Sequence, residues 1–258
     1  MRPLFTIIMP TFNCAAKIDA SAQSVLSQQA GLYEFLVLDG KSTDGTVEKL
    51  RQYGNQIRWV SEPDAGIYDA MNKGIKNAHG RFLYFLGAGD VLRPGVLATL
   101  AGVIERADTQ AKTGLGFYYG DVRWGNSQRR YDGYFSRFKL SRANICHQAI
   151  FYDADIFARL GVYNLRYRYC ADYVFNLQCF ADTHIRRQYV DLVIADYEAV
   201  GWSAQNPDVD FEADFSKLIL KYCGWPCLAG VKVWHGIQWG HGRLLAVRWH
   251  LRRIFHKK

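Results

Sequence analysis

Short apolar segments alternate with segments of helical periodicity through the first 110 residues of the chain. The apolar segments have the character of strands and lie at residues 4–10, 34–39, 56–62 and 81–90. Helical segments follow them at residues 16–28, 45–53, 67–78 and 95–107. Because this alternation is typical of strands joined by crossover helices, the sequence predicts an α/β fold with a mixed, mostly parallel central sheet flanked by helices.

The helix expected at residues 67–78 has the clearest pattern. Its apolar positions recur at helical spacing and form one stripe, made of Ile67, Ala70, Met71, Gly74, Ile75 and Ala78. Beyond residue 110 the pattern is less regular, with strands expected at 116–124, 129–135 and 148–152 and a helix at 171–181. We expect a soft boundary near residue 110, with both halves sharing one sheet.

Polar and acidic residues follow each of the first four strands. In open α/β sheets, ligands bind beyond the carboxyl ends of the strands, so these positions are candidate ligand contacts. In chain order they include Pro10, Thr11, Asn13, Asp39, Asp44, Asp64, Gly89 and Asp90.

Three of these carboxylates also have structural explanations. Asp44 precedes the helix at 45–53 and is expected to be its N-cap. Asp39 ends a buried strand and has no helix to cap, so a ligand role and a turn role both stay open for it. Asp90 either contacts a ligand or forms a turn or cap before the segment VLRPG.

The net charge of +8 is concentrated at the C-terminal end of the chain. Residues 215–258 carry five Lys and four Arg and no acid, a charge of +9, which leaves residues 1–214 at −1. We therefore expect a near-neutral body followed by a basic tail. Apolar residues make up 49% of the 258 residues, a content that excludes wholesale disorder.

The six cysteines are scattered without a CxxC pair, and we interpret them as reduced cytosolic thiols. Cys223 and Cys227 lie near His235, but their apolar setting favours buried or membrane-facing thiols over a zinc site. The N-terminal segment is broken early by Pro10 and is not expected to be a signal peptide. Since no uncharged apolar run reaches about 18 residues, no membrane-spanning helix is expected.

Five motifs occur in order along the chain: TIIMPTFN, FLVLDGKSTDGT, SEPDAGIYDAMNKGIKNAHGRFLYFLGAGD, CHQAIFY and ADYVFNL. Together they resemble the family 2 glycosyltransferases of GT-A fold, particularly bacterial enzymes of colanic-acid and exopolysaccharide biosynthesis. The resemblance covers roughly residues 4–200. It implies a glycosyltransferase domain at residues 1–214, with a nucleotide-binding half at about 1–110 and an acceptor half at about 111–214, followed by the tail at 215–258.

The resemblance also implies a reaction. A sugar would move from a nucleoside-diphosphate sugar to an acceptor hydroxyl with inversion, and the acceptor would be a saccharide or a polyprenyl-diphosphate-linked saccharide used for cell-surface polysaccharide. The residues expected to bind the donor are Pro10, Thr11, Asn13, Asp39, Asp64, Lys73, Gly89 and Asp90. For Lys73, contact with phosphate and a place on a solvated helix face are both open.

A divalent metal ion, Mn²⁺ or Mg²⁺, would neutralise the departing diphosphate. The family's DxD-type element corresponds here to Ala88, Gly89 and Asp90, so the first carboxylate is missing and Asp90 is the expected metal ligand. Mg²⁺ binds through one or two carboxylates together with phosphates and water, so the departure leaves the metal requirement open.

The acceptor hydroxyl needs a positioned general base, and Asp172 matches the acid that the family uses for this purpose. Its structural alternative is an N-cap of the helix that follows. His147 and Gln148 match the family's HQ element and are expected to line the pocket, although a lone His is often structural. Trp202 resembles a later loop that closes over the donor, with core packing as the alternative.

The basic tail places apolar residues on one helical stripe, formed by Leu244, Val247, Leu251, Ile254 and Phe255. Four of the seven tryptophans also lie in the tail. Basic residues beside Trp and Leu are typical of a helix that lies on an anionic membrane surface, which predicts a peripheral protein on the cytoplasmic face of the plasma membrane. A helix packed on the body is the alternative, and no motif supports nucleic-acid binding.

Two other functions stay open on the sequence alone. A nucleotidyltransferase also binds nucleotides on an α/β sheet, but its glycine-rich basic loop after the first strand is absent here. A non-catalytic nucleotide-sugar-binding protein would account for the reduced Ala88-Gly89-Asp90 element.

Overall fold

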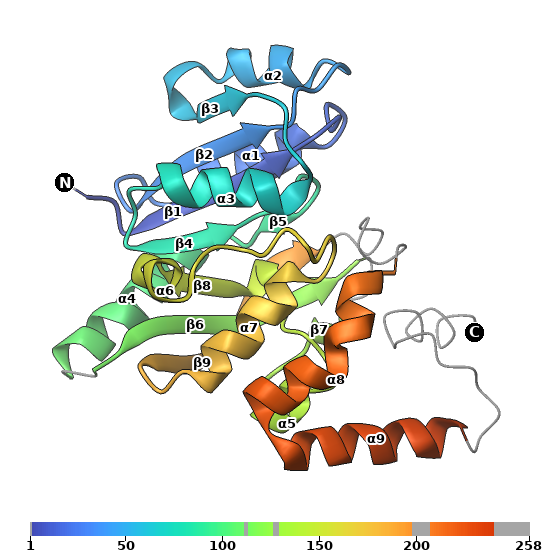
Figure 1. Ribbon diagram of the computed structural model, residues 1–258. Coiled ribbons are helices and arrows are strands. Elements are labelled where there is room, and N and C mark those ends of the chain that lie inside the picture. Colours follow the sequence, from blue (N-terminus) through green and yellow to red (C-terminus); the bar gives the residue numbers. More distant parts are fainter. Residues whose placement is uncertain (1, 111–112, 126–128, 198–206, 240–258) are drawn as a thin grey trace. The chain divides into compact units, whose positions relative to one another are not determined.

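The computed structural model describes residues 2–110, 113–125, 129–197 and 207–239 (Figure 1). The chain forms two compact units. The first is made of Met1–Tyr134, Cys146–Leu165 and Thr183–Glu198, and the second of Phe135–Ile145, Arg166–Asp182 and Ala199–Lys258. Trp202 and the apolar stripe at 244–255 lie outside the described residues.

One mixed sheet occupies the first unit. Its strands in chain order are β1 (Phe5–Thr11), β2 (Tyr33–Asp39), β3 (Arg58–Ser61), β4 (Phe82–Phe85), β5 (Val91–Leu92), β6 (Leu115–Trp124), β7 (Arg130–Tyr131), β8 (Ile150–Asp153) and β9 (Ile185–Tyr197). In space they follow the order β3-β2-β1-β4-β8-β6-β9-β5, with β7 beside β6. The first four strands pair in parallel, whereas β8 runs antiparallel to both β4 and β6. Strands from both sides of residue 110 therefore share one sheet, as expected.

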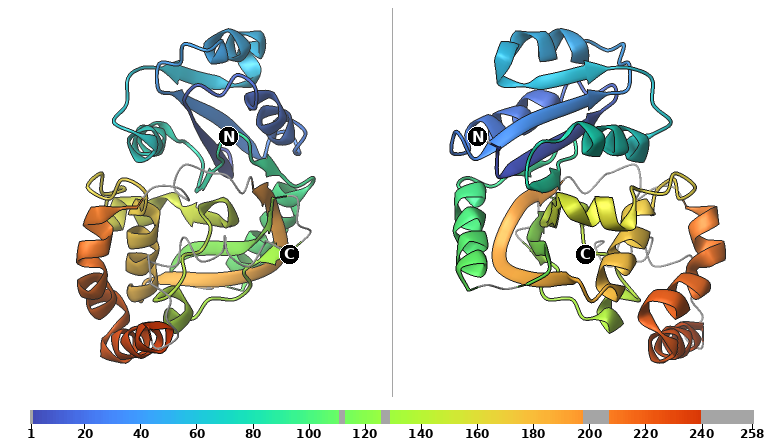
Figure 2. Two further views of the ribbon diagram at one scale, coloured as in Figure 1. Left: turned by 90° about the vertical axis from the view of Figure 1, so that its right-hand side faces the viewer. Right: turned by 60° about the vertical axis from the view of Figure 1, so that its left-hand side comes forward.

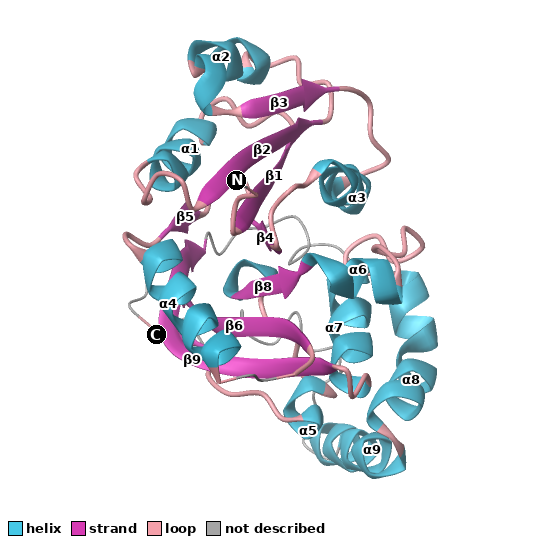
Figure 3. Cartoon of the chain, turned by 90° about the vertical axis from the view of Figure 1, so that its left-hand side faces the viewer, coloured by secondary structure: helices cyan, strands magenta, loops and turns pink. Residues whose placement is uncertain are grey.

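Helices cover both faces of this sheet (Figure 3). On one face lie α1 (Ile18–Leu26), α2 (Thr46–Gln52) and α4 (Val96–Thr109), and their apolar residues share a core with Phe5, Ile7 and Met9 of β1. Because side chains alternate along a strand, Ile8 points to the opposite face, where it meets α3 (Ile67–Asn77). The shorter α6 (Ala154–Leu160) follows β8.

The apolar stripe predicted for α3 is confirmed over most of its length. Ala70, Met71 and Gly74 are buried, whereas Ile67 at the first position is 44% exposed. A Cβ atom at position 74 would lie 2.4 Å from Cγ2 of Ile8, so glycine is what allows the helix to approach β1 this closely.

β9 is a strand that the sequence analysis missed. It pairs in parallel with β6 along its length, with a register shift around Asp121, and in antiparallel fashion with β5 near its end. Figure 2 shows how strongly β9 curls along its course. The strand expected at 129–135 is shorter than predicted, since only Arg130–Tyr131 pairs with β6.

The second unit is helical in its described part. It contains α5 (Arg137–Leu140), α7 (Ala171–Ala181), α8 (Val209–Cys223) and α9 (Trp225–Trp239). The hydroxyl of Tyr173 donates to the carbonyl of Leu140 at 2.6 Å, and Phe211 packs against the Tyr173 ring. α8 runs across residue 214, the expected end of the glycosyltransferase domain. None of the helices in the described ranges is long and apolar enough to cross a membrane.

Candidate functional site

Asp39 joins the carboxyl ends of three parallel strands. It is 2% exposed, and its carboxylate accepts hydrogen bonds from the hydroxyls of Thr11 (3.3 Å), Ser61 (2.6 Å) and Ser42 and from the backbone amide of Ser42 (3.0 Å). Thr11 ends β1, and Ser61 ends β3. A buried carboxylate requires such donors, so Asp39 fastens the three strand ends at the edge where ligands bind in folds of this type.

The loops after β1 and β2 are bound to each other. Oδ1 of Asn13, a residue with a positive φ of 48°, accepts from the amide of Thr43 at 2.9 Å. The backbone amide of Asn13 in turn donates to Oγ of Ser42 at 2.8 Å. Further along, Asp44 accepts from the amide of Ala15 at 2.9 Å. The two loops therefore form one continuous rim over the strand ends.

Asp44 supports the start of α2 without being its N-cap, which corrects the sequence expectation. The N-cap residue is Gly45, which has a left-handed φ of 98°. Oδ1 of Asp44 still accepts from the amide of Thr46 at 3.1 Å. The Asp44 carboxylate thus accepts from an amide in the first turn of α2, but Asp44 lies one residue before the N-cap.

Asp64 lies directly over Gly40. A Cβ atom at position 40 would be 2.5 Å from Oδ2 of Asp64 and 3.4 Å from the ring of Phe12. Oδ1 of Asp64 accepts from the amide of Gly66 at 2.9 Å, which fixes the side chain in the turn before α3. Phe12 is 66% exposed beside these residues, and the sequence analysis did not single it out although an exposed aromatic side chain at a strand end is a visible signal.

Lys73 is held by the β3–α3 loop. Its ammonium group donates to the carbonyl of Pro63 at 2.6 Å and lies 3.0 Å from the carboxylate of Glu62 and 3.6 Å from that of Asp69. Desolvation opposes the charged form, but the two carboxylates outweigh it and raise the pKa of Lys73. The lysine is therefore placed by partners on the loop that carries Asp64.

Asp90 and Gln148 come together after β4. Asp90 is 4% exposed, and its Oδ2 accepts from Nε2 of Gln148 at 2.6 Å. Gln148 belongs to a short 3₁₀ turn (His147–Ala149) that precedes β8, where a strand had been expected to begin. A Cβ atom at Gly87 would lie 2.5 Å from the same Oδ2, so the chain turns back tightly over this glycine. The motifs that carry Asp90 and Gln148 are therefore in contact within the first unit.

A row of polar residues on α1 holds the segment that carries Asp90. Oγ of Ser21 accepts from the amide of Gly89 at 2.9 Å, and Oγ of Ser24 accepts from the amide of Leu92 at 3.0 Å. Just beyond the end of α1, Nε2 of Gln28 donates to the carbonyl of Arg93 at 3.0 Å. The sequence analysis missed this row, because serines on an amphipathic helix give no signal that distinguishes a loop support from a solvated face.

The donor atoms near Asp90 can be tested against a divalent metal ion. No group of three or more His, Cys, Asp or Glu side chains suited to a metal occurs among the residues that the structure describes. Asp90 is nevertheless a fixed carboxylate at a strand end, and carboxylate oxygen is a ligand that Mg²⁺ and Mn²⁺ prefer. Asp90 fits a metal ion that arrives with a diphosphate, because the diphosphate would supply further oxygen ligands.

Asp172 belongs to the second unit, and its meeting with the strand-end residues stays a prediction. It is 5% exposed and lies in the first turn of α7. The N-cap residue of that helix is Cys170, so Asp172 is not the N-cap. Oδ2 of Asp172 accepts from Nδ2 of Asn144 at 2.8 Å.

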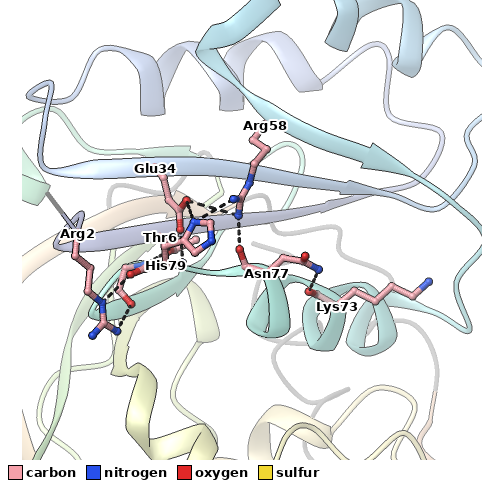
Figure 4. Close-up of polar contacts among 8 residues, drawn as sticks. Arg2, Thr6, Glu34, Arg58, Lys73, Asn77 and His79 are labelled. Carbon is pink, nitrogen blue, oxygen red and sulfur yellow. Dashed lines mark hydrogen bonds and ion pairs between the residues drawn. The ribbon is translucent and has the colours of Figure 1, made fainter.

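A second polar cluster lies at the opposite, amino-terminal edge of the parallel strands (Figure 4). Glu34 accepts from the hydroxyl of Thr6 at 2.6 Å and from the backbone amide of His79 at 2.5 Å, and it lies 3.6 Å from the guanidinium of Arg58. Desolvation acts to raise the pKa of Glu34, but these partners together lower it. The cluster ties β1, β2, β3 and the segment before β4 together away from the ligand edge.

The six cysteines, all within the described ranges, are free thiols. Burial raises the pKa of Cys223 to about 12 and that of Cys14 to about 11. Cys227 is buried, as expected for a thiol in this apolar setting, whereas Cys223 is half-buried.

Comparison with known proteins identifies the family. The family model described as glycosyl transferase family 2 matches residues 6–160. A PGL/p-HBAD biosynthesis glycosyltransferase of Mycobacterium bovis (strain BCG / Pasteur 1173P2) is 38% identical over 216 residues, which are 81% of this chain and 82% of that protein. An uncharacterized glycosyltransferase of Mycobacterium tuberculosis (strain ATCC 25618 / H37Rv) is 32% identical over 68% of each chain.

Solved structures share the fold. Staphylococcus aureus TarS superposes with a TM-score of 0.64 at 16% identity, covering 85% of this chain but only 42% of the TarS chain. The mannosyltransferase PcManGT of Pyrobaculum calidifontis, solved with GDP-Man and Mn²⁺, gives a TM-score of 0.60 at 19% identity over 86% of this chain and 63% of that one. The expected GT-A fold is confirmed, and by sequence the chain belongs to glycosyl transferase family 2 and is a glycosyltransferase.

Proposed function

We propose that this enzyme transfers a sugar from a nucleoside-diphosphate sugar to an acceptor hydroxyl with inversion. The observation that carries the proposal is the position of Asp39, Asp64 and Asp90, which follow three parallel strands at one edge of the sheet. Asp39 is buried among hydroxyl and amide donors, and Asp64 and Asp90 each press against a glycine. Carboxylates so tightly fixed at a strand edge suit the recognition of a polar ligand such as a nucleotide.

The donor class is supported by the solved relatives of the same fold. TarS was solved in complex with UDP and with UDP-GlcNAc, and PcManGT in complex with GDP-Man. In the proposed complex, Asp39, Thr11 and Asn13 face the nucleoside. Asp64 of the β3–α3 loop and Lys73, an α3 residue that binds this loop, lie toward the ribose and phosphates. Pro10 shapes the floor from within β1.

Asp90 is the residue that would hold a divalent metal ion together with the donor diphosphate. Mn²⁺ or Mg²⁺ bound there would stabilise the negative charge that develops on the departing diphosphate. Gln148 fixes Asp90, and the backbone amide of Gly89, which is tied to Ser21, fixes the turn before it. His147 and Trp202 stay proposed as pocket residues, on the resemblance of their motifs alone.

Asp172 is the proposed general base. Inverting transfer needs one carboxylate to accept the proton of the acceptor hydroxyl while the diphosphate departs from the opposite side of the sugar. Asp172 lies in the first turn of α7, where Asn144 holds one of its carboxylate oxygens. The named relative in PGL/p-HBAD biosynthesis supports a glycoconjugate acceptor, for which we propose a lipid-linked saccharide of the cell surface.

We also propose that residues 215–258 contact an anionic membrane from its cytoplasmic side. In the described part of this segment, Trp225 and Val233 are each 63% exposed and Leu220 is 47% exposed. The ammonium of Lys232 lies 6.0 Å from the Trp225 ring centroid. Exposed Trp and aliphatic side chains beside Lys suit the interface between lipid headgroups and chains.

Two measurements test the proposal. Thermal unfolding with UDP-, GDP- and dTDP-sugars, with and without Mn²⁺, should reveal a stabilising donor, because a ligand that binds the folded state raises its stability. With that donor, Asp172→Asn should abolish transfer to an acceptor while donor binding survives. Donor binding without transfer or hydrolysis in the wild type would support a binding protein instead, and full activity of Asp172→Asn would remove the base assignment.

A separate experiment tests the membrane contact. The full-length protein should sediment with vesicles that contain anionic lipid and not with neutral vesicles. Trp225→Ser should weaken this binding and leave transfer to a water-soluble acceptor intact. Equal sedimentation of the wild type with both kinds of vesicle, or with neither, would contradict an electrostatic membrane contact.

A further inference from the structure

Asn144 lies between two side chains of α7 that are one helical turn apart. Its Nδ2 donates to Oδ2 of Asp172 at 2.8 Å, and its Oδ1 accepts from Nδ2 of Asn176 at 2.9 Å. Residues four apart on a helix share a face, so one amide reaches both partners at once. Asn176 is fully buried and Asp172 nearly so, which places this contact inside the second unit.

The chemistry of the two partners fixes which way the Asn144 amide faces. If the amide were flipped, its oxygen would lie against the Asp172 carboxylate, and two acceptors would face each other at hydrogen-bond distance. Its NH₂ group would then face the NH₂ group of Asn176. The carboxylate thus selects the orientation in which Asn144 presents an N–H to Asp172 and its oxygen to Asn176.

We propose that Asn144 is a positioning residue for the general base. This inference rests on the proposed function, because it acts through Asp172. The hydrogen bond to Oδ2 restricts rotation of the Asp172 carboxylate. The oxygen that takes the proton therefore keeps a fixed direction toward the acceptor hydroxyl. Asn176 contributes by holding the amide of Asn144 in place.

Two substitutions of Asn144 test this inference. Asn144→Ala removes the donor that orients the carboxylate, so kcat should fall about tenfold while the KM for the nucleotide sugar stays unchanged. Asn144→Asp places a second carboxylate against Asp172. Because two adjacent carboxylates resist simultaneous ionisation, the acidic limb of the pH–rate profile should move to higher pH by about one unit or more, with activity recovering at high pH.

A double substitution distinguishes positioning from general damage to the fold. In the Asp172→Asn background, Asn144→Ala should reduce the residual rate no further, since the group through which Asn144 acts is gone. Gln178→Ala on the same helix is the matched control, because Gln178 donates to the hydroxyl of Tyr222 at 3.3 Å and lies on another side of α7. It should leave the pH–rate profile unchanged.

The outcomes separate the inference from the function on which it rests. If Asp172→Asn keeps full activity, the base assignment fails. If Asp172→Asn is inactive but Asn144→Ala and Asn144→Asp keep the wild-type rate and acidic limb, Asn144 does not position the base. A further loss from Asn144→Ala in the Asp172→Asn background would show that Asn144 acts on the fold and overturn the inference as well.

Discussion

The side-chain amide of Gln148 donates a 2.6 Å hydrogen bond to Oδ2 of Asp90, across 58 positions of sequence. Gln148 is fixed at two further points. Its Oε1 accepts from the thiol of Cys146 at 2.7 Å, and its backbone carbonyl accepts from the hydroxyl of Tyr84 at 2.9 Å. Because the side-chain amide has a partner at each end, it has little freedom to rotate. It therefore holds one oxygen of the only carboxylate left in the Ala88-Gly89-Asp90 element.

Gln148→Ala should therefore weaken donor binding in the presence of metal. Without its amide partner, the Asp90 carboxylate regains rotational freedom and loses a charge-assisted hydrogen bond, so we expect about a tenfold increase in the dissociation constant of the nucleotide sugar. Titration calorimetry with the donor found by thermal unfolding, in Mn²⁺, measures this change. Gln178→Ala serves as the control, and unaltered affinity in Gln148→Ala would show that Asp90 does not depend on this contact.

The glycines beneath the two carboxylates give a second prediction. A methyl group at Gly40 or Gly87 would lie 2.5 Å from an oxygen of Asp64 or Asp90, so each alanine variant must displace the carboxylate above it. We expect donor affinity to fall about tenfold or more in both variants, with a stability loss of about 1–3 kcal/mol.

Gly102→Ala is the matched control for these variants. Gly102 lies within α4, and a Cβ atom there would come no closer than 3.5 Å to Nη1 of Arg106. Because alanine is a better helix former than glycine, this variant should gain about 0.5–1 kcal/mol and bind the donor normally. Donor binding that survives in Gly40→Ala and Gly87→Ala would separate these carboxylates from the donor site.

The core strands could be predicted from the sequence because their environment is uniform. β1, β2 and β4 are buried on both faces, so their residues form unbroken apolar runs that identify them. β9 has no such run, since Arg186, Arg187, Gln188 and Asp191 interrupt it and most of its residues are only partly buried. Its partner β6 lies about 70 positions earlier in the chain, and register between such distant segments is not encoded locally.

The candidate site divides in the same way. Asp39, Asp64 and Asp90 could be found because the edge used for binding follows from strand direction. The pairing of Asp39 with Ser61 and of Asp90 with Gln148 could not be predicted, because these partners come from segments that are distant in the chain. Asn144 is the same case in the second unit, where an ordinary loop asparagine lies against a helix 28 positions later.

Asn72 supplies a prediction about stability. Its side-chain amide pairs with both backbone groups of Tyr163, accepting from the N–H and donating to the C=O at 2.9 Å each, and it is 6% exposed. Asn72→Ala leaves both backbone groups buried without this partner and should lower the free energy of unfolding by about 1–3 kcal/mol.

Asn72→Asp should be at least as harmful, because it places a carboxylate oxygen against the Tyr163 carbonyl. Urea unfolding measures both variants. Asn77→Ala is the control, since this exposed side chain donates to the Lys73 carbonyl near the end of α3 and its loss should change stability by less than about 0.5 kcal/mol. A similar loss in all three variants would show that the pairing with Tyr163 has no special weight.

Glu34 should make stability depend on acid pH through the cluster at the amino-terminal edge. Its carboxylate is 20% exposed and is held by Thr6, His79 and Arg58, which together lower its pKa below the usual value of 4.5. A carboxyl group with a lowered pKa in the folded state stabilises the protein above its unfolded-state pKa, and this contribution is lost as the pH falls through the folded-state pKa.

Glu34→Gln should therefore be less stable than the wild type by about 1–3 kcal/mol above pH 5, and the difference should shrink as the pH is lowered below 4.5. Urea unfolding of both proteins across this range measures it. Glu48→Gln is the control, because Glu48 is 65% exposed and its 3.5 Å ion pair with Arg51 is screened by water, so this change should stay within about 0.5 kcal/mol at every pH. A difference between wild type and Glu34→Gln that stays constant through the acid range would mean that the charge of Glu34 does not stabilise this edge of the sheet.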